Sequence, residues 1–402
     1  MGKKDKTLCA LCASAVRKIE QRMIAELIFW ISVTLIFYTY IGYPLVTLII
    51  SLFVHNPVDQ QDIEPTVTFL ITAFNEEKNI REKLENTLAL DYPKEKLEIL
   101  VASDGSTDGT DEIVKEFADR GVVLHRVEGR RGKTATQNSA VRWSEGEIVV
   151  FSDAASIYEP NAIRAIVRNY ADPTVGAVSG MYTYENKEGS SAGFGTILFW
   201  KLENFIKSRQ TKIRTITGCC GCIYSVRKVL YTELPLDIIG DLVEPLTILQ
   251  KGYRIVFEPE ARAVEETAGG TKDEFRMRIR VIVRGMNGML FVRDLFNPKK
   301  HPFVSFQLIS HKLLRWLVSL FAIVAFVSNA FLVPTSWFYV FTFACQVAFY
   351  ALAVTGYFKE EAGIHKPIFY LPLYFCIVNL AALISMFKVL WGENIVTWQT
   401  NR

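Results

Sequence analysis

The sequence predicts an α/β domain with a mainly parallel sheet, joined to a membrane by one helix before it and three after it. Between residues 66 and 170, apolar strand-like runs alternate with helix-like segments, which is typical of a parallel sheet covered by helices. Of the 402 residues, 50% are hydrophobic, and four apolar runs are long enough to cross a bilayer. We therefore expect a membrane protein with a globular part.

The N-terminal part is predicted to hold the first of these helices. Residues 1–22 are polar and basic, and residues 23–54 form a predicted transmembrane helix in which Pro44 is expected to introduce a kink. The apolar stretch is too long for a removable signal peptide and lacks a small-residue cleavage site. Residues 55–65 are then expected to link this helix to the globular domain.

The globular domain is predicted to occupy residues 66–272. Its first four strand and helix pairs are expected at residues 66–74 and 76–90, 97–103 and 111–120, 122–127 and 134–145, and 148–152 and 160–170. Ligands of such sheets gather where the strands end. These ends carry Asn75, Glu76, Asp104, Lys133 and Asp153.

The chemistry of these side chains suits a nucleoside diphosphate. Asp104 can accept hydrogen bonds from a nucleoside, Asp153 can hold a hard divalent cation, and Lys133 can offset phosphate charge. Each aspartate alone is explained equally well as a turn or helix cap. Together, the three residues predict a nucleoside-diphosphate site.

An arginine-rich segment, residues 273–298, is predicted to be an amphipathic helix in the membrane interface. Its polar face carries Arg276, Arg280, Arg284 and Asn287. Arg278 falls off this face, so we expect it either to reach toward the interface or to have an anionic partner.

Residues 299–392 are predicted to hold three more transmembrane helices, at about 313–333, 336–358 and 368–391, before a tail of residues 393–402. The net charge of +3 comes from 45 basic and 42 acidic residues. Such a balanced chain is not expected to bind nucleic acid.

Several motifs occur in the order found in membrane-embedded family 2 glycosyltransferases. They are Phe74-Asn-Glu-Glu77, Ala102-Ser-Asp-Gly-Ser-Thr-Asp108, Gly132-Lys133, Asp153, Thr217-Gly-x-x-Gly221, Gly240-Asp241 and Arg278-x-Arg280. The chain resembles the branch that contains bacterial exopolysaccharide synthases. More distantly, it is similar to poly-N-acetylglucosamine, hyaluronan and cellulose synthases.

This resemblance implies a GT-A type domain that uses a nucleotide-activated sugar, usually a UDP-sugar, with Mg²⁺ or Mn²⁺. It implies substrate binding by Asn75, Glu76, Asp104, Lys133, Gly221, Arg278 and Arg280, metal coordination by Asp153, and general-base catalysis by Asp241. In an inverting transfer the general base takes the proton of an acceptor hydroxyl while the nucleoside diphosphate leaves from the opposite face of the sugar.

Two departures from the family pattern keep the acceptor open. Ala155 stands where many relatives have a second acid, and Val281 follows Arg280 where processive synthases have Trp. The leading expectation is transfer onto a growing cell-surface polysaccharide. The first rival is a single transfer to a polyprenyl-phosphate-linked acceptor, and the second is a catalytically inactive scaffold.

Nucleotide sugars are cytosolic, so the domain is expected on the cytosolic side of the cell membrane. Lys299, Lys300 and Lys312 agree with this orientation, whereas the basic residues 1–22 would then lie outside, against the usual charge rule. Translation starting at Met23 would remove that conflict. If a polymer is exported, a homo-oligomer or an accessory secretion protein is the expected partner, because four helices and their surrounding lipids leave a narrow path.

Overall fold

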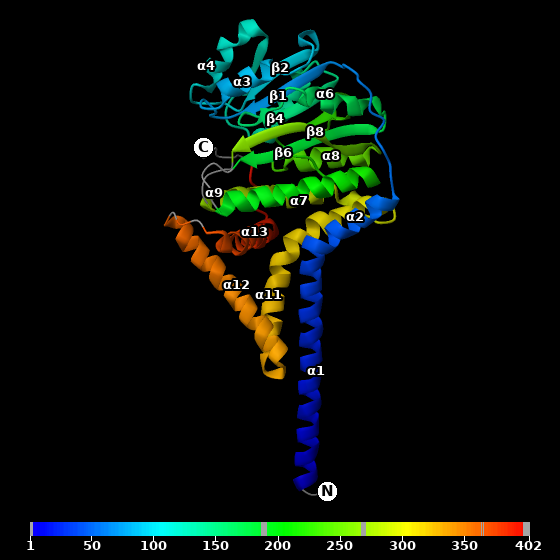
Figure 1. Cartoon of the computed structure of the whole chain (residues 1–402), viewed down its shortest axis with the longest axis vertical. Coiled ribbons are helices and arrows are strands. Elements are labelled where there is room, and N and C mark those ends of the chain that lie inside the picture. Colours follow the sequence, from blue (N-terminus) through cyan, green and yellow to red (C-terminus); the bar gives the residue numbers. More distant parts are fainter. Residues whose placement is uncertain (1–2, 186–190, 267–270, 363, 365, 397–402) are drawn as a thin grey trace.

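The computed structural model describes residues 3–185, 191–266, 271–362, 364 and 366–396. A globular α/β domain lies at one end of the molecule, and long helices extend from its base (Figure 1). The N-terminus lies at the far end of the longest helix, whereas the described C-terminal residues return to the domain.

The first helix begins at Lys3 and runs unbroken through α1 (Lys3–Phe37). The described part of the polar, basic segment at residues 1–22 is therefore helical, because these residues include many good helix formers that extend the apolar helix. A π-helical turn, Tyr38–Gly42, separates α1 from α2 (Tyr43–Phe53). Pro44 cannot donate to the carbonyl of Tyr40, and the chain changes direction here as predicted (Figure 1).

One eight-stranded sheet forms the centre of the domain, in the order β3-β2-β1-β4-β7-β6-β8-β5. The strands are β1 (Val67–Ala73), β2 (Leu97–Ser103), β3 (Val122–Arg126), β4 (Ile148–Asp153), β5 (Ile157–Tyr158), β6 (Val175–Glu185), β7 (Tyr224–Arg227) and β8 (Arg254–Glu266). The first four are parallel, as predicted, and β7 is antiparallel to β4 and β6. Every residue of β1 is buried, which requires cover on both faces.

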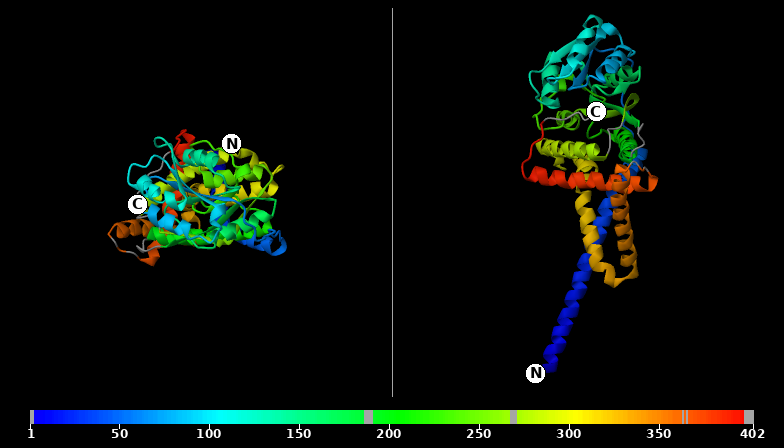
Figure 2. Two further views of the ribbon diagram at one scale, coloured as in Figure 1. Left: turned by 90° about the horizontal axis from the view of Figure 1, so that it is seen from above. Right: turned by 90° about the vertical axis from the view of Figure 1, so that its left-hand side faces the viewer.

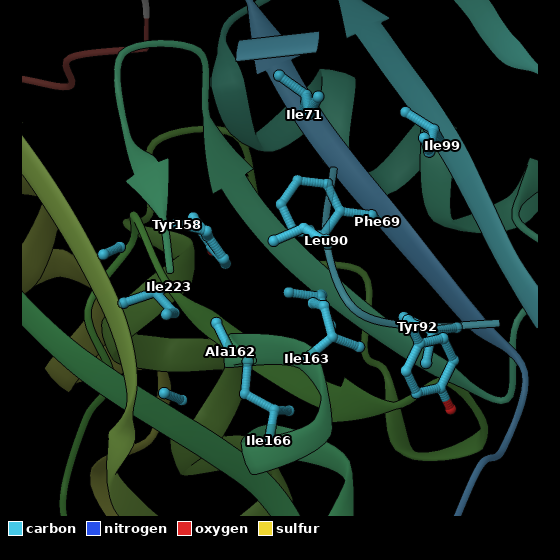
Figure 3. Packing of buried hydrophobic residues seen from close by; sticks show 14 of the residues in the cluster. Phe69, Ile71, Leu90, Tyr92, Ile99, Tyr158, Ala162, Ile163, Ile166 and Ile223 are labelled. Atoms are coloured by element: carbon cyan, nitrogen blue, oxygen red, sulfur yellow. The ribbon is translucent and has the colours of Figure 1, made fainter. Parts of the chain in front are cut away.

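Helices cover the two faces and form two apolar cores. The helices of the domain are α3 (Ile80–Leu88), α4 (Thr110–Glu116), α5 (Lys133–Trp143), α6 (Ala162–Val167), α7 (Ser191–Ile213) and α8 (Gly240–Gln250). In one core, the rings of Phe69 and Tyr158 meet edge to face with centroids 5.0 Å apart (Figure 3). The other core surrounds Phe151 and Tyr224, which are stacked at 4.6 Å. Together these cores hold the strand ends rigidly.

The base of the domain is formed by α7 and by α9 (Thr271–Phe291), the helix predicted to be amphipathic. After α10 (Pro302–Gln307) come α11 (Leu314–Leu332), α12 (Trp337–Glu361) and α13 (Pro367–Leu390). By length and composition, four helical stretches of the described chain could cross a membrane, one N-terminal and three C-terminal. The predicted fold class is therefore confirmed.

One feature of this arrangement was not expected. Figure 2 shows that α13 runs below α9 and roughly along it, at an angle to α1 and to the hairpin of α11 and α12. The apolar side of α9 packs on it, because Ile279 and Met286 contact the cluster that contains Ala381 and Ala382. The apolar face of α9 thus meets protein as well as any lipid.

Candidate active site

The carboxyl ends of three neighbouring parallel strands form the candidate site. β1 lies between β2 and β4, and Thr72 near its end pairs with both Ala102 and Asp153. Asn75, which follows β1, has a φ of 53°. A non-glycine residue in this left-handed region is uncommon, and such residues gather where the backbone must expose a functional group.

Asn75 and Glu76 join the loop after β1 to the loop after β2. The Asn75 Oδ1 atom accepts a hydrogen bond from the Thr107 backbone at 2.8 Å, and the Glu76 backbone donates to Thr110 Oγ1 at 2.8 Å. These contacts fix the rim of the site. The nucleoside-binding roles of Asn75 and Glu76 stay predictions.

Asp104 organises a loop of the site rather than projecting freely. Its fully buried carboxylate accepts hydrogen bonds from the backbone of Arg131 at 2.8 Å and of Gly132 at 3.0 Å, and from Thr136 Oγ1 at 2.9 Å. Gly132 has a φ of 95°, a conformation that L side chains rarely adopt. Asp104 thereby places the loop that delivers Lys133, and its predicted contact with a nucleoside stays a prediction.

Lys133 and Asp153 form an ion pair at the centre of the site. Lys133 is the first residue of α5, and its Nζ donates to Asp153 Oδ1. Burial disfavours the ammonium, but Asp153, Cys222 and Asp241 together outweigh this effect, so the pKa of Lys133 is raised. The residues predicted to meet a diphosphate and a cation therefore meet each other in the structure.

Asp241 lies in the first turn of α8, beside this ion pair. Its backbone carbonyl accepts from Cys219, and a Cβ atom added to Gly221 would lie 2.8 Å from Asp241 Oδ2. Gly221 therefore provides close access to the carboxylate. Burial raises the pKa of Asp241, Lys133 opposes this rise, and Asp153 adds to it. A raised pKa brings a carboxylate closer to the range suited to a general base.

The arginines of α9 differ in what they contact. Arg278 donates to Glu274 Oε1 at 2.7 Å and to the Tyr374 hydroxyl of α13, so it has the anionic partner that the sequence allowed. Arg280 lies close enough to Arg284 to lower the pKa of Arg284. Diphosphate binding by Arg278 and Arg280 stays a prediction.

Arg284 is a site residue that the sequence did not single out. Its Nη2 atom donates to Thr134 Oγ1 and to the Ile238 carbonyl, both at 2.6 Å, and its Nε is buried without a partner. Burial and Arg280 lower its pKa to about 10, whereas Asp241 opposes the change. The signal was present, because Arg284 falls on the predicted polar face of the helix.

The end of the described chain also reaches the site. Asn287 of α9 donates to Asn394 at 3.2 Å, and a Cβ atom at Gly132 would lie 2.6 Å from the carbonyl oxygen of Val396. Residues 392–396 therefore pass over the loop that Asp104 holds. The sequence predicted only a polar tail there.

The environment of Asp153 shows what could hold a cation. Ala155 supplies no second acid, and Cys222 Sγ donates to Asp153 Oδ2 at 3.6 Å. Among the described residues, no group of three His, Cys, Asp or Glu side chains is arranged to hold a metal. A hard cation fits only with one protein carboxylate, so it would need phosphate oxygens and water to complete its shell.

Comparison with known proteins shows similarity to glycosyltransferases. Residues 68–234 match the model of the family Glycosyl transferase family 2. Poly-beta-1,6-N-acetyl-D-glucosamine synthase from Staphylococcus aureus (strain COL) is 29% identical over 243 residues, 58% of this chain and 57% of that protein. The Staphylococcus epidermidis synthase is 25% identical over 287 residues, 69% and 67% of the two chains. The chain thus spans little more than half of the first synthase.

A solved structure covers more of the chain. The mannosyltransferase from Pyrobaculum calidifontis, in complex with GDP-Man and Mn²⁺, superposes with a TM-score of 0.69 and 24% identity. The match covers 91% of this chain and 100% of that one. The predicted GT-A type fold is confirmed, and residues 68–234 of the sheet domain are similar to family 2 glycosyltransferases.

Proposed function

We propose that this chain is an inverting glycosyltransferase of family 2 that acts at a membrane surface. It moves a sugar from a nucleoside-diphosphate donor to a saccharide acceptor. The observation that carries the proposal is the gathering of Lys133, Asp153 and Asp241 at one edge of the sheet. Asp241 is the second residue of α8, and Val243 of the same helix packs against Gly288 of α9. The proposed general base, Asp241, therefore lies next to α9, at the side of the domain from which the long apolar helices extend.

Each of these residues has a chemical role in the proposed transfer. Asp241 takes the proton of the acceptor hydroxyl, and its raised pKa favours proton uptake. Lys133 and Arg284 place positive charge where the leaving diphosphate develops negative charge, which is commonly a large part of catalysis. Asp153 and the donor's phosphates would hold Mg²⁺ or Mn²⁺, which supplies further charge neutralisation when bound. Lys133 must then exchange its contact with Asp153 for the diphosphate.

The donor is proposed to be a nucleotide sugar, with a UDP-sugar as the first expectation. The mannosyltransferase that shares the fold binds GDP-Man, so a GDP-sugar is the alternative. The choice depends on the pocket around the base and the sugar. Both donors present the same diphosphate to Lys133.

The geometry favours a lipid-linked saccharide as the acceptor. Of the apolar stretch of α12, only 11% is buried, so the other described helices of this chain do not enclose it. Val281 also replaces the Trp expected of processive synthases. The second candidate is a growing cell-surface polysaccharide, and it is supported by the two staphylococcal synthases.

We place the domain on the cytosolic face of the cell membrane, where nucleotide sugars are found. Lys299 and Lys300 are exposed between α9 and α11 and agree with this orientation. Labelling of single-cysteine variants at these positions tests it. A membrane-impermeant maleimide should label them in lysed cells and not in intact ones.

The function is tested with the full chain in nanodiscs and a panel of UDP- and GDP-sugars. We expect one donor to release nucleoside diphosphate, and release to rise when a prenyl-diphosphate-linked sugar is added. A product one sugar longer supports the lipid-linked acceptor, whereas a ladder supports the polysaccharide. If no donor releases nucleotide, the proposal is overturned and an inactive scaffold is the better explanation.

A further inference from the structure

A buried group of charged residues lies below the active site, between α7 and the start of α11. Glu203 of α7 accepts hydrogen bonds from His311 Nε2 at 3.0 Å and from Arg315, and Lys312 Nζ lies 3.8 Å from its other oxygen. The Glu203 side chain is 4% exposed. Although burial opposes it, the three basic neighbours lower the pKa of Glu203 well below its usual range. Glu203 is therefore a carboxylate anion.

Lys207 extends this group toward the active site. It lies four residues after Glu203 on α7 and is 3% exposed, so both side chains are on one buried face of the helix. Its Nζ donates a long hydrogen bond of 3.5 Å to Ser179 Oγ. Lys207 is also close enough to Asp241 to oppose the rise of its pKa. The positive charges thus run from α11 to the proposed base.

The charges of this group do not balance. Lys207, Lys312 and Arg315, which we call the basic cluster, are three cations near only two carboxylates. These are Glu203 and, at the end toward the active site, Asp241. The Nε atom of Arg315 is also buried without a hydrogen-bond partner. Buried charges and donors are costly unless they are paired. An excess of cations with an unused donor therefore indicates that an anion binds here.

The position of the basic cluster limits which anion this can be. α7 lies between the sheet and the helices below it (Figure 1), so the cluster is at the boundary between the domain and the membrane. Lys312 and Arg315 keep 20% and 11% of their side chains exposed there. An anion at this boundary can be carried by a lipid, while its attached sugar reaches toward Asp241.

We propose that the basic cluster binds the phosphate or diphosphate group of a lipid-linked acceptor. The inference rests on the proposed function and names the part of the acceptor that the protein recognises. A neutral polysaccharide offers no charge for these residues. The aromatic rings of Phe199 and Trp200, which lie near Arg315 and Lys207, provide apolar walls beside the cluster.

Binding is tested by calorimetry on the full chain in phosphatidylcholine nanodiscs. A saturating nucleoside diphosphate occupies the donor site, so that it does not take up the probe. The probe is farnesyl diphosphate, and farnesol, inorganic diphosphate and phosphatidylglycerol are the comparisons. We expect farnesyl diphosphate to bind at least about ten-fold more tightly than each of them, since a charge-assisted contact is worth about this factor. Equal binding of any comparison overturns the proposal.

Variants separate recognition from folding. Lys207→Gln and Lys312→Gln should each weaken farnesyl diphosphate binding about ten-fold. Lys201→Gln, which changes an exposed lysine of the same helix, should not. Glu203→Gln removes the competing carboxylate and should keep or tighten binding. Wild-type affinity in both lysine variants, or an equal loss in Glu203→Gln, would overturn the proposal.

This test stands apart from the test of the proposed function, because binding is measured without turnover. If the wild-type chain releases nucleotide but its lysine variants bind the probe normally, only the acceptor site is wrong. If no donor is turned over, the proposed function fails whatever the calorimetry shows.

Discussion

Two lysines lie near Asp153, one in the active site and one in the core, and their environments shift their pKa values in opposite directions. On the side of the active site, Lys133 pairs with the carboxylate, keeps 28% of its side chain exposed and has a raised pKa. On the side of the core, Lys83 is fully buried, donates to the Ser156 carbonyl and lies 4.2 Å from the centre of the Tyr158 ring. Burial lowers its pKa to about 7, although Asp153 opposes this change.

The contrast separates a replaceable contact from a permanent one. The Lys133 side chain is partly exposed to water. Its contact with Asp153 can be replaced when a cation binds Asp153 and a diphosphate binds Lys133. Lys83 is fully buried against the rings of Phe69 and Tyr158, so its ammonium is not exposed at the surface. Proximity to Asp153 therefore does not define a site residue, and the access of the side chain decides which lysine can act in binding.

The largest effect is expected at Asp241, the proposed general base. Asp241→Asn should lower the transfer rate about 10³-fold, in the range for loss of a general base, while nucleotide binding is kept. Because burial raises the pKa of Asp241, wild-type activity should fall at a higher pH than for an ordinary carboxylate as the solution is acidified. Initial rates and a pH profile measure both. Undiminished transfer by the variant would exclude Asp241 as the base.

Removal of the Asp153 carboxylate, which lies near both Lys133 and Lys83, should have the next largest effect. Asp153→Asn should lower transfer about 10²-fold and weaken the apparent affinity for Mn²⁺, because it removes the protein ligand and frees Lys133. Rates measured across a Mn²⁺ titration after EDTA treatment report this. Glu159→Gln, a change of a carboxylate on the nearby surface, is the control. A wild-type Mn²⁺ dependence in Asp153→Asn would show that Asp153 does not hold the cation.

A smaller effect is expected where space rather than charge is changed. Gly221→Ala adds a Cβ atom 2.8 Å from Asp241 Oδ2, so the carboxylate must move. We expect kcat to fall about ten-fold while the KM for the donor changes little, since a displacement of the base mainly affects the chemical step. Steady-state kinetics with the best donor give both values. An equal rise in KM would place Gly221 in donor binding instead.

The smallest effect is expected on the core side, and it concerns stability. The folded chain releases the Lys83 proton near pH 7, whereas an unfolded lysine keeps it to about 10.5. The unfolded state binds more protons in between, so stability should rise with pH by up to about 1.4 kcal/mol per unit. Thermal unfolding from pH 7 to 9 should show this slope in the wild type and in Lys78→Met, an exposed control, but not in Lys83→Met.

The residues at the strand ends are the part of the candidate site that could be predicted from the sequence. Each predicted residue up to Asp153 follows or ends a strand, because the alternation of apolar and polar segments is a local property. Arg278 and Arg284 show the limit. Both lie on the predicted helix α9, yet Arg278 reaches Tyr374 of α13, and Arg284 reaches Thr134 and the neighbourhood of Asp241. Periodicity gives the face of a helix, but not the element that packs against it.

The sequence by itself determined the class of domain, the number of apolar helices, and the residues that the parallel strands deliver to one edge. These follow from hydrophobic patterning and motif order, which need no long-range information. Only the tertiary structure decided that Lys133 pairs with Asp153, that α13 packs beneath α9, and that Lys207 lies near Lys312. Such contacts join residues far apart in the chain, and they depend on how whole elements pack.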